Sequence, residues 1–103
     1  MTNVAVPAFQ LTAATPDTLA LSGVLNFDTA NAAWQAMRTA LDEGAPARLD
    51  LGGVQQSDSA GLSCVIAVLA ESVRRGRPLQ AVHIPGGMLA LAQVCEVDRL
   101  LTG

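Results

Sequence analysis

Apolar and polar residues alternate in two short segments near the start of the chain. Residues 8–14, AFQLTAA, form a weak strand candidate, and residues 18–25, TLALSGVL, alternate Leu19 and Leu21 with smaller or polar neighbours. The turn signal TPD, Thr15–Asp17, separates the two segments. This pattern predicts two strands that pair as an antiparallel hairpin.

Later segments carry apolar residues at the spacing of an α-helix. The first stripe is Ala30, Ala33, Trp34, Met37 and Leu41, and the second is Leu62, Val65, Ile66, Leu69 and Val73. Asp28 or Thr29 is placed to cap the first helix and Gly44 to end it, while Gly76 and Pro78 end the second. A third helix is expected to open at Gly86–Gly87 and run to about Glu96, followed by a short extra turn.

Two further strands are predicted between these helices. Residues 47–51, ARLDL, follow Pro46, and residues 79–84, LQAVHI, are stopped by Pro85. Strands that alternate with helices pair in parallel through right-handed crossovers. The chain therefore predicts a single α/β domain over residues 1–103. Its small mixed sheet has about four strands, beginning with an antiparallel hairpin and continuing with parallel strands, and about three helices pack on this sheet.

Composition supports one folded core and argues against a nucleic-acid partner. Of the 103 residues, 50% are hydrophobic and only 15% are charged, and the net charge is −3. Nucleic-acid phosphates require clustered basic residues, and the one cluster here is Arg74–Arg77. This cluster is either a solvated helix end or a docking patch for an acidic surface. The apolar excess predicts that another subunit covers part of the surface.

The sequence carries no recognisable targeting signal and no cysteine pattern typical of a disulfide or a metal site. The longest apolar run, Cys64–Ala70, is far shorter than the ~20 residues of a membrane-spanning helix. The first ten residues lack a basic region followed by an apolar core, so no signal peptide and a cytoplasmic location are expected. Cys64 and Cys95 lack a CxxC or histidine partner, which predicts two buried free thiols and no metal site.

Residues suited to catalysis or phosphate binding are few. The single histidine, His83, falls within the fourth predicted strand, where a structural role is expected because no nucleophile motif surrounds it. Gly52–Gly53 and Gly86–Gly87 do not extend to a phosphate-binding loop. Gly52–Gly53 is instead expected to end the third strand in a turn. These features predict a protein that is not an enzyme and has no cofactor.

The segment SDSAGLS, Ser57–Ser63, combines polar and very small residues at the carboxyl end of a predicted parallel strand. Ligands and partners of α/β sheets commonly bind at such strand ends. Asp58 and Ser59 can each cap the following helix. A phosphate on Ser59 would gain from the helix dipole but be repelled by Asp58. The segment is therefore either a helix cap alone or a docking and switch site.

The string LDLGGVQQSDSAGL resembles the signature of STAS domains, which read aliphatic-Asp-Leu, a short connection, then Asp-Ser/Thr-x-Gly-Leu. The resemblance spans nearly the whole chain, and its element order agrees with the prediction above. Within the family, DTLALSG and the helix carrying Trp34 are similar to the MlaB-like branch, the STAS subunits of phospholipid-transport ABC complexes.

The resemblance implies a non-catalytic regulatory or assembly subunit that docks on the ATPase subunit of such a complex and reaches the inner membrane only through it. Asp58 matches the motif acid, Ser59 the functional hydroxyl and Gly61 the motif glycine. The partner-binding residues implied are Asn26, Ser57, Asp58, Ser59, Ala60, Gly61 and Ser63. The alternative is an anti-sigma-factor antagonist in which a partner kinase phosphorylates Ser59, and a third possibility is a small nucleotide-binding protein.

One segment departs from the family pattern. Where the family often has Gly-Glu-Leu-Asp, this chain has GVLN, Gly23–Asn26, so Val24 and Asn26 replace two acids. Asn26 is expected to keep a hydrogen bond near Ser59 without carrying charge. This departure bears on a phosphorylation switch and leaves docking unaffected.

Overall fold

The computed structural model describes residues 9–15, 17–44 and 46–102. Predictions that rest on residues 1–8 or on Pro16 of the TPD turn lie outside the described residues. The elements are β1 (Phe9–Thr15), β2 (Thr18–Leu25), α1 (Ala30–Glu43), β3 (Arg48–Ser57), α2 (Ser59–Arg74), β4 (Gln80–Val82), α3 (Gly86–Val94) and α4 (Asp98–Thr102). The predicted third helix with its extra turn corresponds to α3 and α4.

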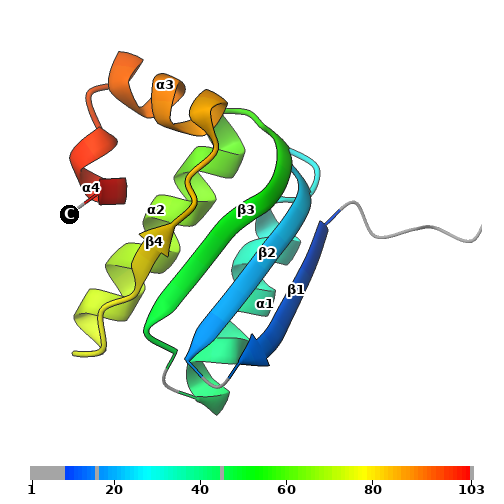
Figure 1. Ribbon diagram of the computed structural model, residues 1–103, viewed down its shortest axis with the longest axis vertical. Helices are drawn as coiled ribbons and strands as arrows, with labels where there is room; N and C mark the ends of the chain where they lie inside the picture. Colours follow the sequence, from blue (N-terminus) through cyan, green and yellow to red (C-terminus); the bar gives the residue numbers. More distant parts are fainter. Residues whose placement is uncertain (1–8, 16, 45, 103) are drawn as a thin grey trace, which may run out of the picture.

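The strands form one mixed sheet in the order β1-β2-β3-β4. β1 pairs with β2 antiparallel, opposing Leu11 to Leu21, and β2 and β3 then pair in parallel, as do β3 and β4. Helices α1 and α2 lie side by side against one face of this sheet, α4 lies beside α2 and β4, and α3 lies at the top of the view in Figure 1, beyond the carboxyl ends of the strands. The predicted α/β class, with a hairpin followed by parallel strands, is confirmed.

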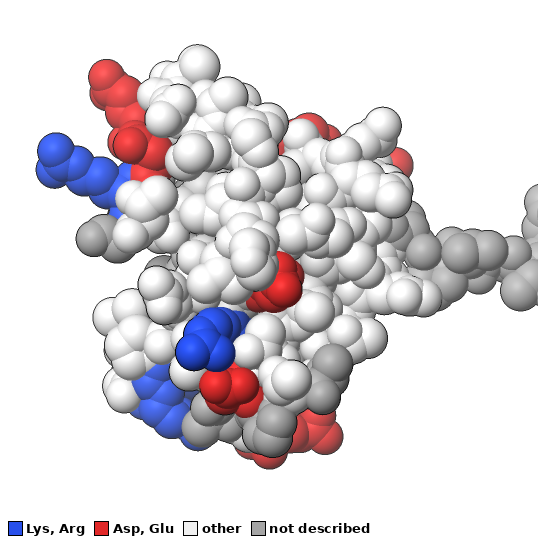
Figure 2. Space-filling view, viewed as in Figure 1, with Lys and Arg blue, Asp and Glu red and all other residues white. Residues whose placement is uncertain are grey.

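The core lies between the sheet and helices α1 and α2. Leu21 of β2, Leu49 of β3, Met37 of α1 and Val65 of α2 are all at most 1% exposed. They occupy the positions that the alternating and helical patterns predicted to be apolar, because a strand buries every second residue and a helix buries one stripe. The opposite face of the sheet is turned toward the viewer in Figure 2, where charged side chains are sparse.

The arginine cluster at the end of α2 binds groups of the same chain. Arg75 pairs with Glu71 at 2.8 Å and with Asp42 of α1 at 2.6 Å. Arg77 donates to the backbone carbonyl of Gly44 at 3.3 Å, just past the end of α1. The cluster thus ties the carboxyl ends of α1 and α2 together. Arg75 and Glu71 are partly buried, while Asp42 is exposed, and surface ion pairs such as Arg75–Asp42 contribute only ~0–1 kcal/mol.

Strand β3 continues through Gly52–Gly53, so the predicted turn there is wrong. The strand runs on to Ser57, and its register with β2 shifts between Ala20 and Ser22, as in a bulge. A Cβ atom at Gly53 would lie 2.7 Å from the Cβ of Ser22. Glycine is therefore needed here for close approach of the two strands rather than for a chain reversal.

Strand β4 is shorter than predicted, and His83 lies outside it. The backbone of His83 has φ 55°, a left-handed conformation that cannot continue a strand. Its side chain is exposed, and its Nδ1 lies 3.1 Å from Oδ1 of Asp50. His83 therefore does not have the structural role inside a strand that the sequence predicts, and it pairs with Asp50 at the surface instead.

The cysteines differ in their surroundings. Cys64 is buried beside α1, its Sγ lies 3.3 Å from the carbonyl oxygen of Ala30, and burial raises its pKa to about 11. Cys95 is exposed where α3 ends, so the prediction of two buried thiols is wrong for this residue. The buried residues of α3 are Met88 and Ala92, one helical turn apart, and Cys95 falls three positions after Ala92, off this stripe.

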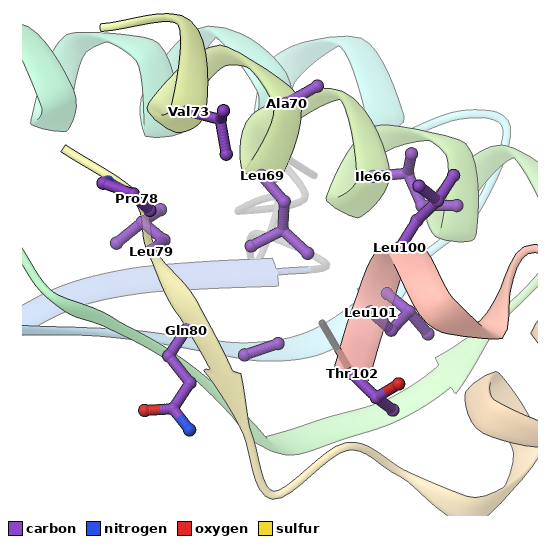
Figure 3. Close-up of a pocket in the computed structure, with 11 residues that line it drawn as sticks. Ile66, Leu69, Ala70, Val73, Pro78, Leu79, Gln80, Leu100, Leu101 and Thr102 are labelled. Atoms are coloured by element: carbon purple, nitrogen blue, oxygen red, sulfur yellow. The ribbon is translucent and has the colours of Figure 1, made fainter. Parts of the chain in front are cut away.

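An apolar groove of about 490 Å³ lies between α2, the start of β4 and α4 (Figure 3). Leu69, Leu79 and Leu101 point into it, and Val73 and Leu100 stand at its side. The hydrogen-bonding side chains that line it are those of Gln80 and Thr102.

Within the described ranges, no helix is both long and apolar enough to cross a bilayer.

Candidate functional site

The carboxyl ends of β2 and β3 meet at one edge of the sheet, where α1 and α2 both begin (Figure 1). We refer to the surface formed there by Asn26–Asp28 and Ser57–Ser59 as the tip. The chain brings these two segments together because β2 and β3 are parallel neighbours, paired up to Leu25 and Ser57. The tip contains four of the seven residues that the sequence singled out, namely Asn26, Ser57, Asp58 and Ser59.

Asp58 holds the two halves of the tip together. Its Oδ1 accepts a hydrogen bond from the backbone N–H of Gly61 at 3.0 Å, and its Oδ2 accepts one from the N–H of Phe27 at 3.1 Å. The N–H of Gly61 is the main cause that lowers the pKa of Asp58, and the N–H of Phe27 adds to it. Asp58, and not Ser59, is thus the N-cap of α2, and its carboxylate stays ionised at neutral pH.

Ser59 is the first residue of α2 and is exposed. None of the hydrogen bonds among the described residues uses its hydroxyl, whereas the hydroxyl of Ser63, one turn later, donates to the Ser59 carbonyl at 2.9 Å. The hydroxyl of Ser57 donates to the carbonyl of Asp58 at 3.2 Å. Of the tip hydroxyls, that of Ser59 is therefore the one that faces solvent without a partner in the described part of the chain.

Asn26 turns toward the start of α1. Its Oδ1 accepts from the backbone N–H of Asp28 at 2.9 Å and of Thr29 at 3.2 Å. The Thr29 hydroxyl, predicted as a cap, instead donates to the carbonyl of Val24 at 2.9 Å. The expected hydrogen bond of Asn26 near Ser59 is therefore replaced by one that caps α1, because the amide can satisfy the free N–H groups at that helix start.

Gly61 is buried, and Ala60 is half-buried. A Cβ atom at Gly61 would lie 2.4 Å from the carbonyl oxygen of Leu25 and 2.8 Å from the hydroxyl oxygen of Ser57. The resemblance implies Gly61 as a partner-binding residue, and the structure places it on the inner side of the helix start. Its role is to let the first turn of α2 lie directly on the end of β2, which positions Ser59.

A concave surface of about 500 Å³ adjoins the tip. It is lined by Val24, Asn26, Gln55, Gln56, Ser57, Asp58 and Gly87. The amide side chains of Asn26, Gln55 and Gln56 can both donate and accept hydrogen bonds. Together with the Asp58 carboxylate they suit recognition of a polar protein surface, and the tip itself includes neither an imidazole nor a thiol.

The sequence prediction missed Gln55, Gln56, Gly87 and Phe27. The two glutamines stand directly before SDS in the sequence, and extending the third strand past Gly52–Gly53 would have placed them at its end. Phe27 directly follows Asn26, and the chain has only two phenylalanines. An aromatic residue in a loop of such a chain is a signal that could have pointed to the site. Nothing local to Gly87 connects it to the tip, because α3 reaches this edge only through the fold.

Comparisons with known proteins agree with this architecture. A family model described as "Mlab, STAS domain" matches residues 9–102. The anti-sigma factor antagonist SpoIIAA in its unphosphorylated form is similar in structure, with a TM-score of 0.69 at 18% identity over 90% of this chain and 84% of that one. The Bacillus cell fate determinant SpoIIAA in the phosphorylated form gives a TM-score of 0.67 at 20% identity, covering 90% of this chain and 87% of that one. No curated protein matches the chain.

Proposed function

The chain belongs to the STAS domain family of the MlaB type, and on this premise we propose that it is a non-catalytic regulatory and assembly subunit of a bacterial phospholipid-transport ABC complex. It docks on the ATPase subunit through the tip, with Ser59 at the centre of the contact. In this role the protein works at the cytoplasmic side of the inner membrane and reaches the membrane only through the complex.

The exposed hydroxyl of Ser59 on a rigid helix start is the observation that carries this proposal. Asp58 fixes the position of Ser59 by binding the N–H of Gly61 in the same helix and the N–H of Phe27 across the tip. A partner that contacts Ser59 therefore meets a surface that needs no rearrangement, and preorganised surfaces lose less entropy on binding. Ser63 lies one turn along the same helix and is also exposed, which extends the contact along α2.

The groups on the tip support recognition rather than catalysis. Its polar groups are two hydroxyls, the Asn26 amide and the carboxylates of Asp28 and Asp58, whose hydrogen bonds orient a partner. Such contacts specify a partner, while affinity comes from the apolar groups that become buried.

Co-purification of the complex tests this proposal. The protein is co-expressed with the ATPase and permease subunits, and the wild type is expected to purify with the ATPase. Ser59→Arg should reduce the ATPase recovered to background, because a long cation on the tip prevents close contact. Thr39→Arg is the control, since Thr39 is an exposed hydroxyl residue on a helix, like Ser59, but lies in the second half of α1, away from the tip.

Two results would contradict the proposal in different ways. If the wild type does not purify with the ATPase, the proposed function is wrong. If Ser59→Arg and Thr39→Arg both purify with it as well as the wild type does, the function stands but the tip is not the docking site.

A second candidate is supported by the likeness to SpoIIAA, which has been solved in unphosphorylated and phosphorylated forms. In this alternative the protein is an anti-sigma-factor antagonist, and a partner kinase phosphorylates Ser59. A phosphate there would place a charge of about −1.5 to −2 beside the ionised Asp58 and change the surface that a partner meets. Incubation with the kinase and ATP, followed by mass spectrometry of wild type and Ser59→Ala, separates this candidate from the first.

A further inference from the structure

Phe27 is a large apolar side chain at the tip that the fold leaves in solvent. It is 83% exposed, the highest value among the large hydrophobic residues that the structure describes as exposed. The other two aromatic residues of the chain, Phe9 and Trp34, pack at the border of the core. Single exposed apolar residues are common, so the surroundings of Phe27 decide whether it has a role.

The backbone around Phe27 is held by a closed set of hydrogen bonds. The N–H of Asn26 donates to Oγ1 of Thr29 at 2.9 Å, and the N–H groups of Asp28 and Thr29 donate to Oδ1 of Asn26. The N–H of Phe27 itself donates to the Asp58 carboxylate at 3.1 Å. The aromatic ring is therefore carried by a fixed loop, which is the state in which an exposed anchor binds at the lowest entropic cost.

Phe27 also stands beside the polar part of the tip. Asn26, its neighbour in the chain, and Asp58, its hydrogen-bond partner, both line the concave surface. An aromatic anchor next to hydrogen-bonding groups is the usual composition of a protein interface.

The charges next to Phe27 indicate what kind of surface it meets. Asp28 follows it in the chain, the ionised Asp58 binds its N–H, and the two segments of the tip contain no basic residue. A partner with carboxylates opposite these two groups would be repelled, whereas lysine or arginine side chains would be attracted.

We propose that Phe27 is the apolar anchor of the tip and inserts into an apolar pocket of the ATPase subunit whose rim carries basic side chains. The inference rests on the proposed function and adds to it the residue that supplies the affinity and the chemistry of the opposing surface. Aromatic anchors of this kind dominate binding in many interfaces.

The dissociation constant for the isolated ATPase subunit tests the proposal. Phe27→Ala should weaken binding by about 30-fold or more, which corresponds to an anchor of about 2 kcal/mol. Phe27→Leu should stay within about fivefold of the wild type, because it keeps an apolar side chain. Val73→Ala is the matched control, since Val73 is 62% exposed and lies at the opposite end of α2. Binding of the wild type should weaken as NaCl is raised from about 50 mM to about 300 mM.

The outcomes separate this inference from the function on which it rests. All variants should keep the melting temperature of the wild type, so a loss of binding is not a loss of fold. If the wild type binds the ATPase and Phe27→Ala binds it within about twofold of wild type, the anchor is wrong and the proposed function stands. If the wild type does not bind, both are wrong. If the wild type sediments as a dimer that Phe27→Ala dissociates, the ring binds a second copy and the proposal is overturned.

Discussion

Replacing Gly61 by alanine is the most direct test of how the tip is built. In a helix, exchanging glycine for alanine normally stabilises a protein by about 0.5–1 kcal/mol, because glycine loses more backbone freedom on folding. At Gly61 the added Cβ would lie 2.4 Å from the Leu25 carbonyl oxygen, whereas ordinary contacts begin at 3.4 Å. The first turn of α2 must therefore move away from β2 by about 1 Å.

The cost of that movement exceeds the gain in helix propensity. Overpacking of this kind costs about 1–3 kcal/mol. The same Leu25 carbonyl accepts a hydrogen bond from the N–H of Asp58 at 3.2 Å, and stretching it costs about a further 0.5–1.5 kcal/mol. We expect Gly61→Ala to lower the free energy of unfolding by about 1–3 kcal/mol, and the melting temperature by at least about 5 °C in a domain of this size.

Thermal and urea unfolding of wild type, Gly61→Ala and Gly86→Ala measure this effect. Gly86 is the control, because an added Cβ there would meet nothing within 4 Å at the start of α3. Gly86→Ala should match or exceed the stability of the wild type, by up to about 1 kcal/mol. A Gly61→Ala variant as stable as Gly86→Ala would refute the close packing of α2 on β2 and, with it, the placement of Ser59.

Three further outcomes follow from other contacts. Asp58→Ala should lower the stability of the protein at neutral pH. The difference in stability between this variant and the wild type should shrink as the pH falls below 3.8 and through the lowered pKa of Asp58, because protonation then removes the charged cap from the wild type. Acid titrations of both proteins, followed by circular dichroism, measure this difference. Ser72→Ala should cost about 1–3 kcal/mol in urea unfolding, since the buried Ser72 hydroxyl accepts the N–H of Leu79 at 2.9 Å and its loss leaves that N–H unsatisfied. Ala70→Phe, which adds a ring at the apolar groove, should leave binding to the ATPase unchanged, whereas a loss of binding would move the docking site from the tip to the groove.

Several parts of the fold follow from patterns within a few residues. Met37 and Leu41 of α1, and Val65 and Leu69 of α2, are buried as their helical spacing predicts. Asp58 was a recognisable cap from its position before the apolar stripe. These features could be predicted because helix periodicity and capping depend on residues at most about four positions apart.

Other parts required the register between distant strands. Gly52–Gly53 has a local preference for a turn, yet the pairing of β3 with β2 around a bulge keeps it in the strand. His83 leaves the strand that its apolar neighbours suggested, and Cys95 falls past the last buried position of α3. In each case a tertiary contact, or its absence, outweighed the local pattern.

For the candidate site, the sequence by itself determined that a capped helix starts with Asp58 and Ser59 at the end of a strand. The tertiary structure decided what surrounds that start, because Phe27 and Asp58 are 31 residues apart and meet only through the parallel register of β2 and β3. It also decided that Gly61 faces inward, since that depends on how closely α2 approaches Leu25. Capping is an interaction between chain neighbours, whereas the shape of the tip is set by the packing of segments that the sequence holds far apart.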